Sequence, residues 1–260
     1  MTSKQFLMLA ATVLGGLVYF NVLMGVSMGV AFFNADWSPT VPWFPIPLLA
    51  LIWLVTWWVK GRWNIRLTAP SNIPWVRIYA FSFVAMLAGK SIKVLEGAYH
   101  GTTLAAPTLP EGVSTSFGWV FLLMLPIIAG VLSEIAYRGI MQTRFEAIAP
   151  LWPTLVVLAI INTLGHMGFT DVSTQWIYLV AMNIGFGYTA YLAQSIIPVI
   201  VVHATMNVIF PGSQYLWGPF ALGELSALNL AAIAVLGTAL TAVAVWLARG
   251  TTVAGNLKAA

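Results

Sequence analysis

The sequence contains no cysteine and very little charge. The absence of cysteine excludes disulfide bonds, Cys-ligated metal sites and thiol nucleophiles. Only 7% of the 260 residues are charged, whereas about 25% are charged in an ordinary soluble domain. Eleven basic and seven acidic residues cannot cover the surface of a soluble globule of this size. The composition therefore excludes a soluble enzyme, a nucleic-acid-binding protein and a disordered tail.

Apolar residues take the place of charge and make up 60% of the chain. A helix needs about 20 predominantly apolar residues to cross a bilayer. Eight segments approach this description, at 6–33, 43–59, 75–95, 117–145, 151–169, 176–192, 196–210 and 226–248. The first is too long for the apolar part of a signal peptide, so we expect it to be retained. The sequence predicts an all-α fold, a polytopic transmembrane helical bundle of about eight spans.

The whole chain, residues 1–260, is predicted to form a single membrane domain whose partner is the lipid bilayer. We divide it into N-terminal spans (1–116), a core (117–210) and a C-terminal span with its tail (211–260). Lys60, Arg62, Arg66 and Arg77 flank one loop, which the excess of basic residues in cytoplasmic loops places inside. Counting spans from this loop predicts that both termini are cytoplasmic. We expect a multi-pass protein of the cell membrane, the cytoplasmic membrane if it is bacterial.

Among the ionisable side chains of the predicted spans, we expect Glu134, Arg138, His166 and His203 to lie inside the bundle, away from the span ends. A charge at the bilayer centre costs about 2.5–3.5 kcal/mol on insertion scales, so such groups are functional candidates. Glu134 and Arg138 lie four residues apart, within ion-pair reach on one helix face. His203 and Asn207 share the same spacing. Both pairs also have purely structural explanations. Glu134 and Arg138 would neutralise each other, and His203 and Asn207 would form interhelical hydrogen bonds.

The hairpin of the fourth and fifth segments relates Glu134 to His166, since each lies sixteen residues from Pro150. At 1.5 Å per residue both lie about 24 Å from the turn, at one depth. We therefore predict that one carboxylate and the two imidazoles converge in a cavity. Glu134, His166 and His203 would also suit zinc, which binds carboxylate and imidazole ligands.

These residues resemble a known family, the CAAX prenyl protease and bacteriocin-processing (CPBP, or Abi) intramembrane proteases. Residues 133–139 (SEIAYRG) resemble its EExxxR motif, His166 stands where the family has FxxxH, and residues 203–207 (HATMN) resemble its HxxxN motif. The resemblance covers roughly residues 117–210. It implies an intramembrane endopeptidase in which Glu134 activates water and Arg138 holds Glu134. It also implies that His166, His203 and Asn207 position the water or stabilise the oxyanion, with or without zinc.

The sequence departs from the family pattern at two positions. Ser133 replaces the first glutamate of EExxxR, and Asn162 replaces the phenylalanine of FxxxH. On an ideal helix Glu134 is rotated about 100° from Ser133, so it does not simply take over the missing position. Either the helix is re-aimed, with help from Pro126, or Glu134 serves a different water, or hydrolysis is lost. Ser133 as a nucleophile with a histidine base is a further, minor alternative.

Three functions follow from these features. The first is an intramembrane endopeptidase of the CPBP type, acting on membrane-associated peptides or lipidated proteins. The second, favoured by Ser133, is an inactive relative that binds or helps assemble a membrane protein partner. The third is a transporter or lipid-modifying enzyme that reuses the polar cavity, although the sequence shows no inverted repeat.

Overall fold

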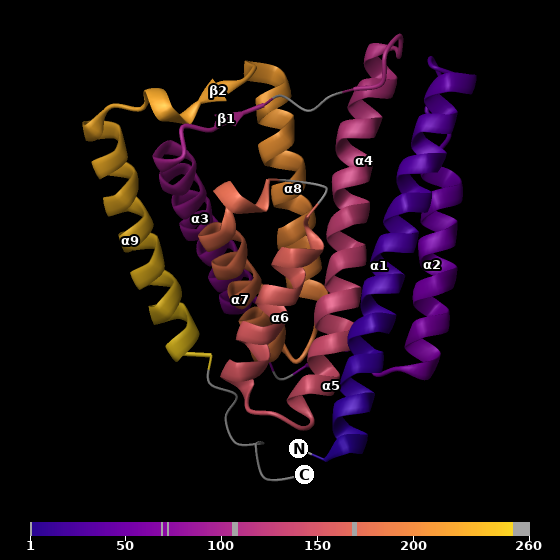
Figure 1. Ribbon diagram of the computed structural model, residues 1–260, viewed down its shortest axis with the longest axis vertical. Coiled ribbons are helices and arrows are strands. Elements are labelled where there is room, and N and C mark those ends of the chain that lie inside the picture. Colours follow the sequence, from indigo (N-terminus) through magenta and orange to yellow (C-terminus); the bar gives the residue numbers. More distant parts are fainter. Residues whose placement is uncertain (1, 69, 72, 106–108, 168–170, 252–260) are drawn as a thin grey trace. The chain divides into compact units, whose positions relative to one another are not determined.

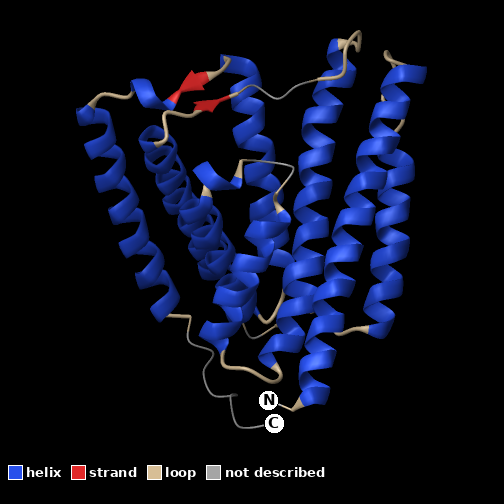
Figure 2. Ribbon diagram, in the orientation of Figure 1, coloured by secondary structure: helices blue, strands red, loops and turns tan. Residues whose placement is uncertain are grey.

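A computed structural model of the protein describes all residues except 1, 69, 72, 106–108, 168–170 and 252–260. Within the described part, helices form nearly all of the regular structure (Figure 2). The α-helices are α1 (Ser3–Trp37), α2 (Pro45–Arg62), α3 (Trp75–Tyr99), α4 (Thr115–Glu134), α5 (Thr143–Glu146), α6 (Leu151–Gly165), α7 (Trp176–Ala193), α8 (Ile197–Trp217) and α9 (Ala227–Arg249). A π-helix, η1 (Ile135–Gln142), joins α4 to α5, and η2 (Val172–Thr174) and η3 (Leu222–Glu224) are short 3₁₀ turns. Strands β1 (Thr103–Leu104) and β2 (Phe220–Ala221) pair in a two-stranded sheet. The all-α prediction is confirmed.

Each predicted apolar segment corresponds to a helical stretch. The fourth segment covers α4, η1 and α5, which follow one another without a break. The predicted end of the fifth segment, residue 169, lies outside the described residues. The seventh segment was expected to be short and to end at residue 210, but α8 continues through Pro211 to Trp217.

Four of the helical stretches are long and apolar enough to cross a membrane: Ser3–Trp37, Trp75–Tyr99, Thr115–Glu146 and Ala227–Arg249. On α9, Leu228 and Val235 are 79% and 70% exposed. Large apolar side chains that are exposed to this extent are expected to contact lipid rather than water. The protein is therefore an integral membrane protein, while the count of eight spans and the cytoplasmic termini stay predictions.

The chain forms two compact units, each assembled from segments distant in sequence. The first unit comprises Met1–Ile65, Leu104–Ile148 and His203–Phe220, and the second comprises Arg66–Thr103, Ala149–Val202 and Ala221–Ala260. In the first unit α1 contacts both α2 and α4 along its length (Figure 1). The fully buried ring of Phe44, at the start of α2, lies 5.7 Å from that of Phe117 on α4.

The connection between α1 and α2 is held by one buried amide, that of Asn34. Its Nδ2 donates to the carbonyls of Ser38 and Val41 at 3.2 and 3.0 Å, and its Oδ1 accepts from the Phe44 amide at 2.9 Å. Backbone groups that leave a helix in an apolar setting need such partners. Asn34 therefore fixes the turn that places Phe44 against α4.

In the second unit α3 contacts α7 and α9, and α6 contacts α7 (Figure 1). The carboxylate of Glu96, which is 8% exposed, accepts hydrogen bonds from the amides of Ile177 and Tyr178, each at 2.9 Å. These amides belong to the first turn of α7, where backbone donors lack intrahelical partners. A side chain of α3 thus caps α7, as the positive end of the helix dipole favours.

We expect Asn34→Leu to destabilise the protein, because two carbonyls and one amide lose their partner in an apolar setting. The loss per buried unsatisfied group is about 1–3 kcal/mol, so the thermal unfolding midpoint should fall by several degrees. Asn21→Leu is the matched control on the same helix, since Asn21 is exposed and donates only to the Leu17 carbonyl. Equal midpoints for the two variants would contradict this role for Asn34.

Candidate active site

The predicted site residues Glu134 and Arg138 lie where the α-helical geometry of α4 gives way to η1. Glu134 is the last residue of α4, and all eight residues of the π-helix are buried. A π-helix has i→i+5 hydrogen bonds, so its turn is wider than that of an α-helix, and it frequently occurs at functional sites. The change of period begins directly after the motif glutamate. It re-aims the residues that follow, including Arg138.

The carboxylate of Glu134 is fully buried and has a basic neighbour at each oxygen. Oε1 lies 2.6 Å from Nδ1 of His203, and Oε2 lies 3.2 Å from Nε of Arg138. The side chain of Arg138 is 4% exposed and that of His203 is 15% exposed. Since a carboxylate only accepts hydrogen bonds, Nδ1 of His203 carries the shared proton. The predicted ion pair therefore forms, and His203 joins it.

Ser133, which replaces the first motif glutamate, contacts the same imidazole. Its hydroxyl donates to the Gly130 carbonyl at 3.0 Å and lies 3.4 Å from Nδ1 of His203. Two consecutive residues of α4 thus reach one ring nitrogen, in spite of the rotation between them. Glu134 touches the histidine that the missing carboxylate would face.

Helix α8 brings His203 to α4 because the two helices approach closely at small residues. A Cβ atom on Gly130 would lie 3.1 Å from the backbone nitrogen of Ala204. One turn further along α8, Nδ2 of Asn207 donates to the carbonyl of Pro126 at 3.3 Å. The small pair and this hydrogen bond set the spacing between the helices. Asn207 therefore lies beside the predicted site residues, with its amide bound to the backbone of α4.

His166 lies in the second unit, one residue after the end of α6. Its Nδ1 is 2.7 Å from the carbonyl of Asn162 and donates to it. The side chain of Asn162 in turn donates to Asn183 on α7, and Asn183 donates to the Leu179 carbonyl at 2.8 Å. The ring of His166 is thus held by the backbone of α6, while the Asn162 side chain separately joins α6 to α7. Its convergence with Glu134 and His203 stays a prediction.

The donor set of the first unit does not make a metal site by itself. A zinc site takes at least three protein ligands, whereas this unit brings together one carboxylate and one imidazole. The second carboxylate oxygen faces the guanidinium of Arg138 at 3.2 Å and accepts no hydrogen bond from the described residues. Among the residues that the structure describes, no group of three or more His, Asp or Glu side chains is arranged to hold a metal ion. The zinc set of Glu134, His166 and His203 stays a prediction.

Tyr137 is a feature of this region that the sequence did not single out. It is 1% exposed, and its ring lies 5.9 Å from that of Phe20 on α1. Within the described ranges its hydroxyl has no hydrogen-bond partner. A tyrosine in an apolar span is usually a core residue. Its only signal in the sequence is its position three residues after Glu134.

Comparison with known families bears directly on this region. Residues 115–209 match the family model described as Rce1-like, type II CAAX prenyl endopeptidase. The resemblance to CAAX prenyl proteases is confirmed. The matched segment runs from the start of α4 into α8 and contains Glu134, Arg138, His166, His203 and Asn207. Neither the curated proteins nor the solved structures gave a match.

We expect Gly130→Ala to disturb the site, because the new methyl group would press on the backbone of α8 at Ala204. Overpacking of this kind costs about 1–3 kcal/mol, and relief by separation of the helices would move His203 away from Glu134. The measurement is the thermal unfolding midpoint. Gly25→Ala is the control, since a Cβ there has no atom within 4 Å; an equal midpoint for both variants would refute the close approach.

Proposed function

We propose that the protein is an intramembrane endopeptidase of the CAAX protease type, in which Glu134 and His203 together activate water. The observation that carries this proposal is the 2.6 Å contact between the buried Glu134 carboxylate and Nδ1 of His203. General bases in enzymes are carboxylates or imidazoles held within hydrogen-bond reach of the proton they take. The family match over residues 115–209 supports the choice of peptide hydrolysis.

In the proposed reaction the Glu134–His203 pair takes one proton from a water while the water oxygen attacks the peptide carbonyl. The tetrahedral intermediate then collapses, the C–N bond breaks, and the pair returns the proton to the leaving amine. Arg138, at 3.2 Å, supplies a positive charge beside Glu134 in its apolar surroundings. In this account Ser133 is a packing neighbour of His203 and not a nucleophile.

His166 and Asn207 are included in this proposal for different reasons. His166 enters through the family motif, as a group that stabilises the oxyanion. The hydrogen bond to the Asn162 carbonyl would keep its ring in one orientation. Asn207 donates to the Pro126 carbonyl, so we assign it a positioning role: it holds α8, and with it His203, against α4.

The proposed substrates are membrane-associated peptides or lipidated protein tails, cut at the cell membrane. A protease within an integral membrane protein suits a substrate that the bilayer already concentrates. The proposal further assigns the chain to a multi-pass topology with cytoplasmic termini, as the distribution of basic residues predicts.

A second function, an inactive relative that binds or assembles a membrane protein, is favoured by one residue. Ser133 stands where the family motif has its first glutamate, and its hydroxyl is engaged with the Gly130 carbonyl. If the missing carboxylate is indispensable, the Glu134–Arg138 pair serves only to neutralise buried charge.

Glu134→Gln is expected to abolish cleavage, because an amide accepts no proton from water; the loss should be at least about a hundredfold. The measurement is a comparison of new peptide termini in membranes of a null strain that expresses either wild type or the variant. Glu111→Gln is the matched control, since Glu111 is exposed in a loop. Full cleavage by Glu134→Gln would overturn the mechanism.

Ser133→Glu separates the two functions in the same assay. If the protein is a working protease, termini appear with wild type and disappear with Glu134→Gln. If it is an inactive relative, termini appear only when Ser133→Glu restores the family motif. The second pattern would replace the proposed protease by a binding role.

We also expect cleavage by the purified protein to continue when a zinc chelator is present. The reason is the donor set: the first unit brings together one carboxylate and one imidazole, whereas a zinc site takes at least three protein ligands. The assay compares the cleavage rate with and without chelator, with zinc added back as the control. Loss of the rate on chelation and its recovery with zinc would show that the metal-assisted alternative is correct.

A further inference from the structure

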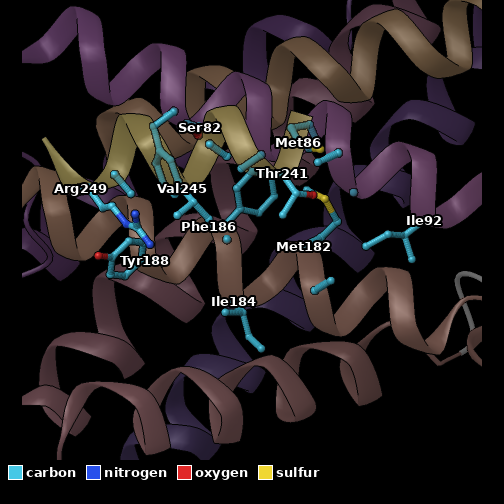
Figure 3. A pocket seen from close by; sticks show the side chains of 18 of the residues that line it. Ser82, Met86, Ile92, Met182, Ile184, Phe186, Tyr188, Thr241, Val245 and Arg249 are labelled. Carbon is cyan, nitrogen blue, oxygen red and sulfur yellow. The ribbon is translucent and has the colours of Figure 1, made fainter. Parts of the chain in front are cut away.

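The second unit contains a cavity of about 580 Å³ that the proposed protease site does not use. It is bordered by α3, α7 and α9, and its lining includes Met86, Met182, Phe186 and Val245 (Figure 3). Ligand pockets usually measure about 300–1,000 Å³ and are mostly apolar. A largely apolar cavity of this size, in an integral membrane protein, suits a hydrocarbon chain.

Small residues leave this space open. Gly185 on α7 lines the cavity, and a Cβ there would meet only the Cβ of Ala85, at 4.0 Å. Helix α9 contributes Thr241, Ala244 and Ala248, which lie on one face because they are three and four residues apart. Larger side chains at these positions would fill the cavity, so its volume follows from the local sequence.

One end of the cavity is basic and aromatic. Arg249, in the last turn of α9, lines it together with Tyr188 and Trp152. The rings of Tyr188 and Trp152 stack at 5.4 Å. Tyrosine and tryptophan favour the level of the lipid headgroups. The positive-inside rule also predicts this end of α9 to be cytoplasmic, so the cavity runs from the headgroup level into the apolar region.

A second guanidinium, that of Arg77, lies beside the same helix end. Its Nε and Nη2 donate to the carbonyls of Leu247 and Trp246 at 2.8 and 2.9 Å. Over the described part of the chain, no carboxylate forms an ion pair with Arg77 or Arg249. Within the described ranges, the end of α9 therefore carries two positive charges that no carboxylate pairs with.

Ser82, in the cavity wall, is a further unsatisfied group. It is 1% exposed, and its hydroxyl has no hydrogen-bond partner among the described residues. Buried hydroxyl groups usually have a partner, and an exception calls for an explanation. The oxygen is covered in this rotamer, and rotation of the side chain toward the cavity would let the hydroxyl donate to the ester carbonyl of a lipid, which lies just below the phosphate.

We propose that this cavity binds one anionic phospholipid of the cytoplasmic leaflet, with its phosphate at Arg249 and one acyl chain between α3, α7 and α9. Basic pockets between membrane helices on the cytoplasmic side are known to bind anionic lipid headgroups. The inference does not depend on proteolysis, because it rests on the second unit alone.

The test uses the full-length protein in nanodiscs of phosphatidylcholine and phosphatidylglycerol in equal amounts. After release into detergent, native mass spectrometry counts the lipids that each protein molecule retains. We expect wild type to retain one phosphatidylglycerol. Arg249→Gln should lower its retention about fivefold, since each basic residue near the surface contributes about 1 kcal/mol to anionic lipid binding. Arg249→Lys should retain it.

Two further variants test the cavity. Gly185→Leu should abolish retention by filling the space, whereas Gly29→Leu should not, because a Cβ on Gly29 of α1 has no neighbour within 4 Å. Arg62→Gln, at the end of α2, is the control for charge and should have no effect. Equal retention of the two lipids, an effect of Arg62→Gln as large as that of Arg249→Gln, or retention by a folded Gly185→Leu would each overturn the proposal. Thermal unfolding of every variant identifies those that fail to fold.

Discussion

A buried carboxylate in an apolar bundle is the constraint on which the first unit depends. Glu134 is fully buried, so a charge there requires partners that compensate for the loss of water. Arg138 supplies the opposite charge from the same chain segment, and His203 supplies a hydrogen bond from α8. Arg138 reaches both oxygens, with Nε 3.2 Å from Oε2 and Nη1 donating to Oε1 at 3.4 Å, and His203 shares Oε1 with it. The packing of α4, η1 and α8 is what brings both into place.

The contacts around this carboxylate explain the unusual backbone. Pro126 has no amide hydrogen and so breaks the regular ladder of α4, while its carbonyl accepts from Asn207. Gly130 permits the backbone of α8 to approach, and the π-helix begins directly after Glu134. These features occupy successive turns on one stretch of helix. The first two bring α8 close enough for the carboxylate to meet His203, and the π-helix sets the position of Arg138.

The sequence predicted the helices well and the site less completely, for one physical reason. Long apolar runs bounded by proline and polar residues reflect local constraints, so α1, α3, α7 and α9 begin and end close to the expected residues. The Glu134–Arg138 contact also follows from local spacing. The π-helix and the bond between Asn207 and Pro126 depend on packing between distant segments. A regular helix of 3.6 residues per turn predicts neither the π-helix nor this hydrogen bond.

The serine at position 133 changes the charge balance of the site as well as its shape. Two adjacent carboxylates in an apolar cavity repel, and one of them would be held protonated. With Ser133 there is one carboxylate, and Arg138 balances it, so the buried pair is neutral overall. Such a pair is easier to bury than a single unpaired charge, and it leaves Arg138 in place beside the carboxylate that the proposed reaction uses. Catalysis by this site would then depend on His203 sharing the proton. The contact at Nδ1 of His203 therefore links the loss of the first glutamate to the proposed hydrolytic function.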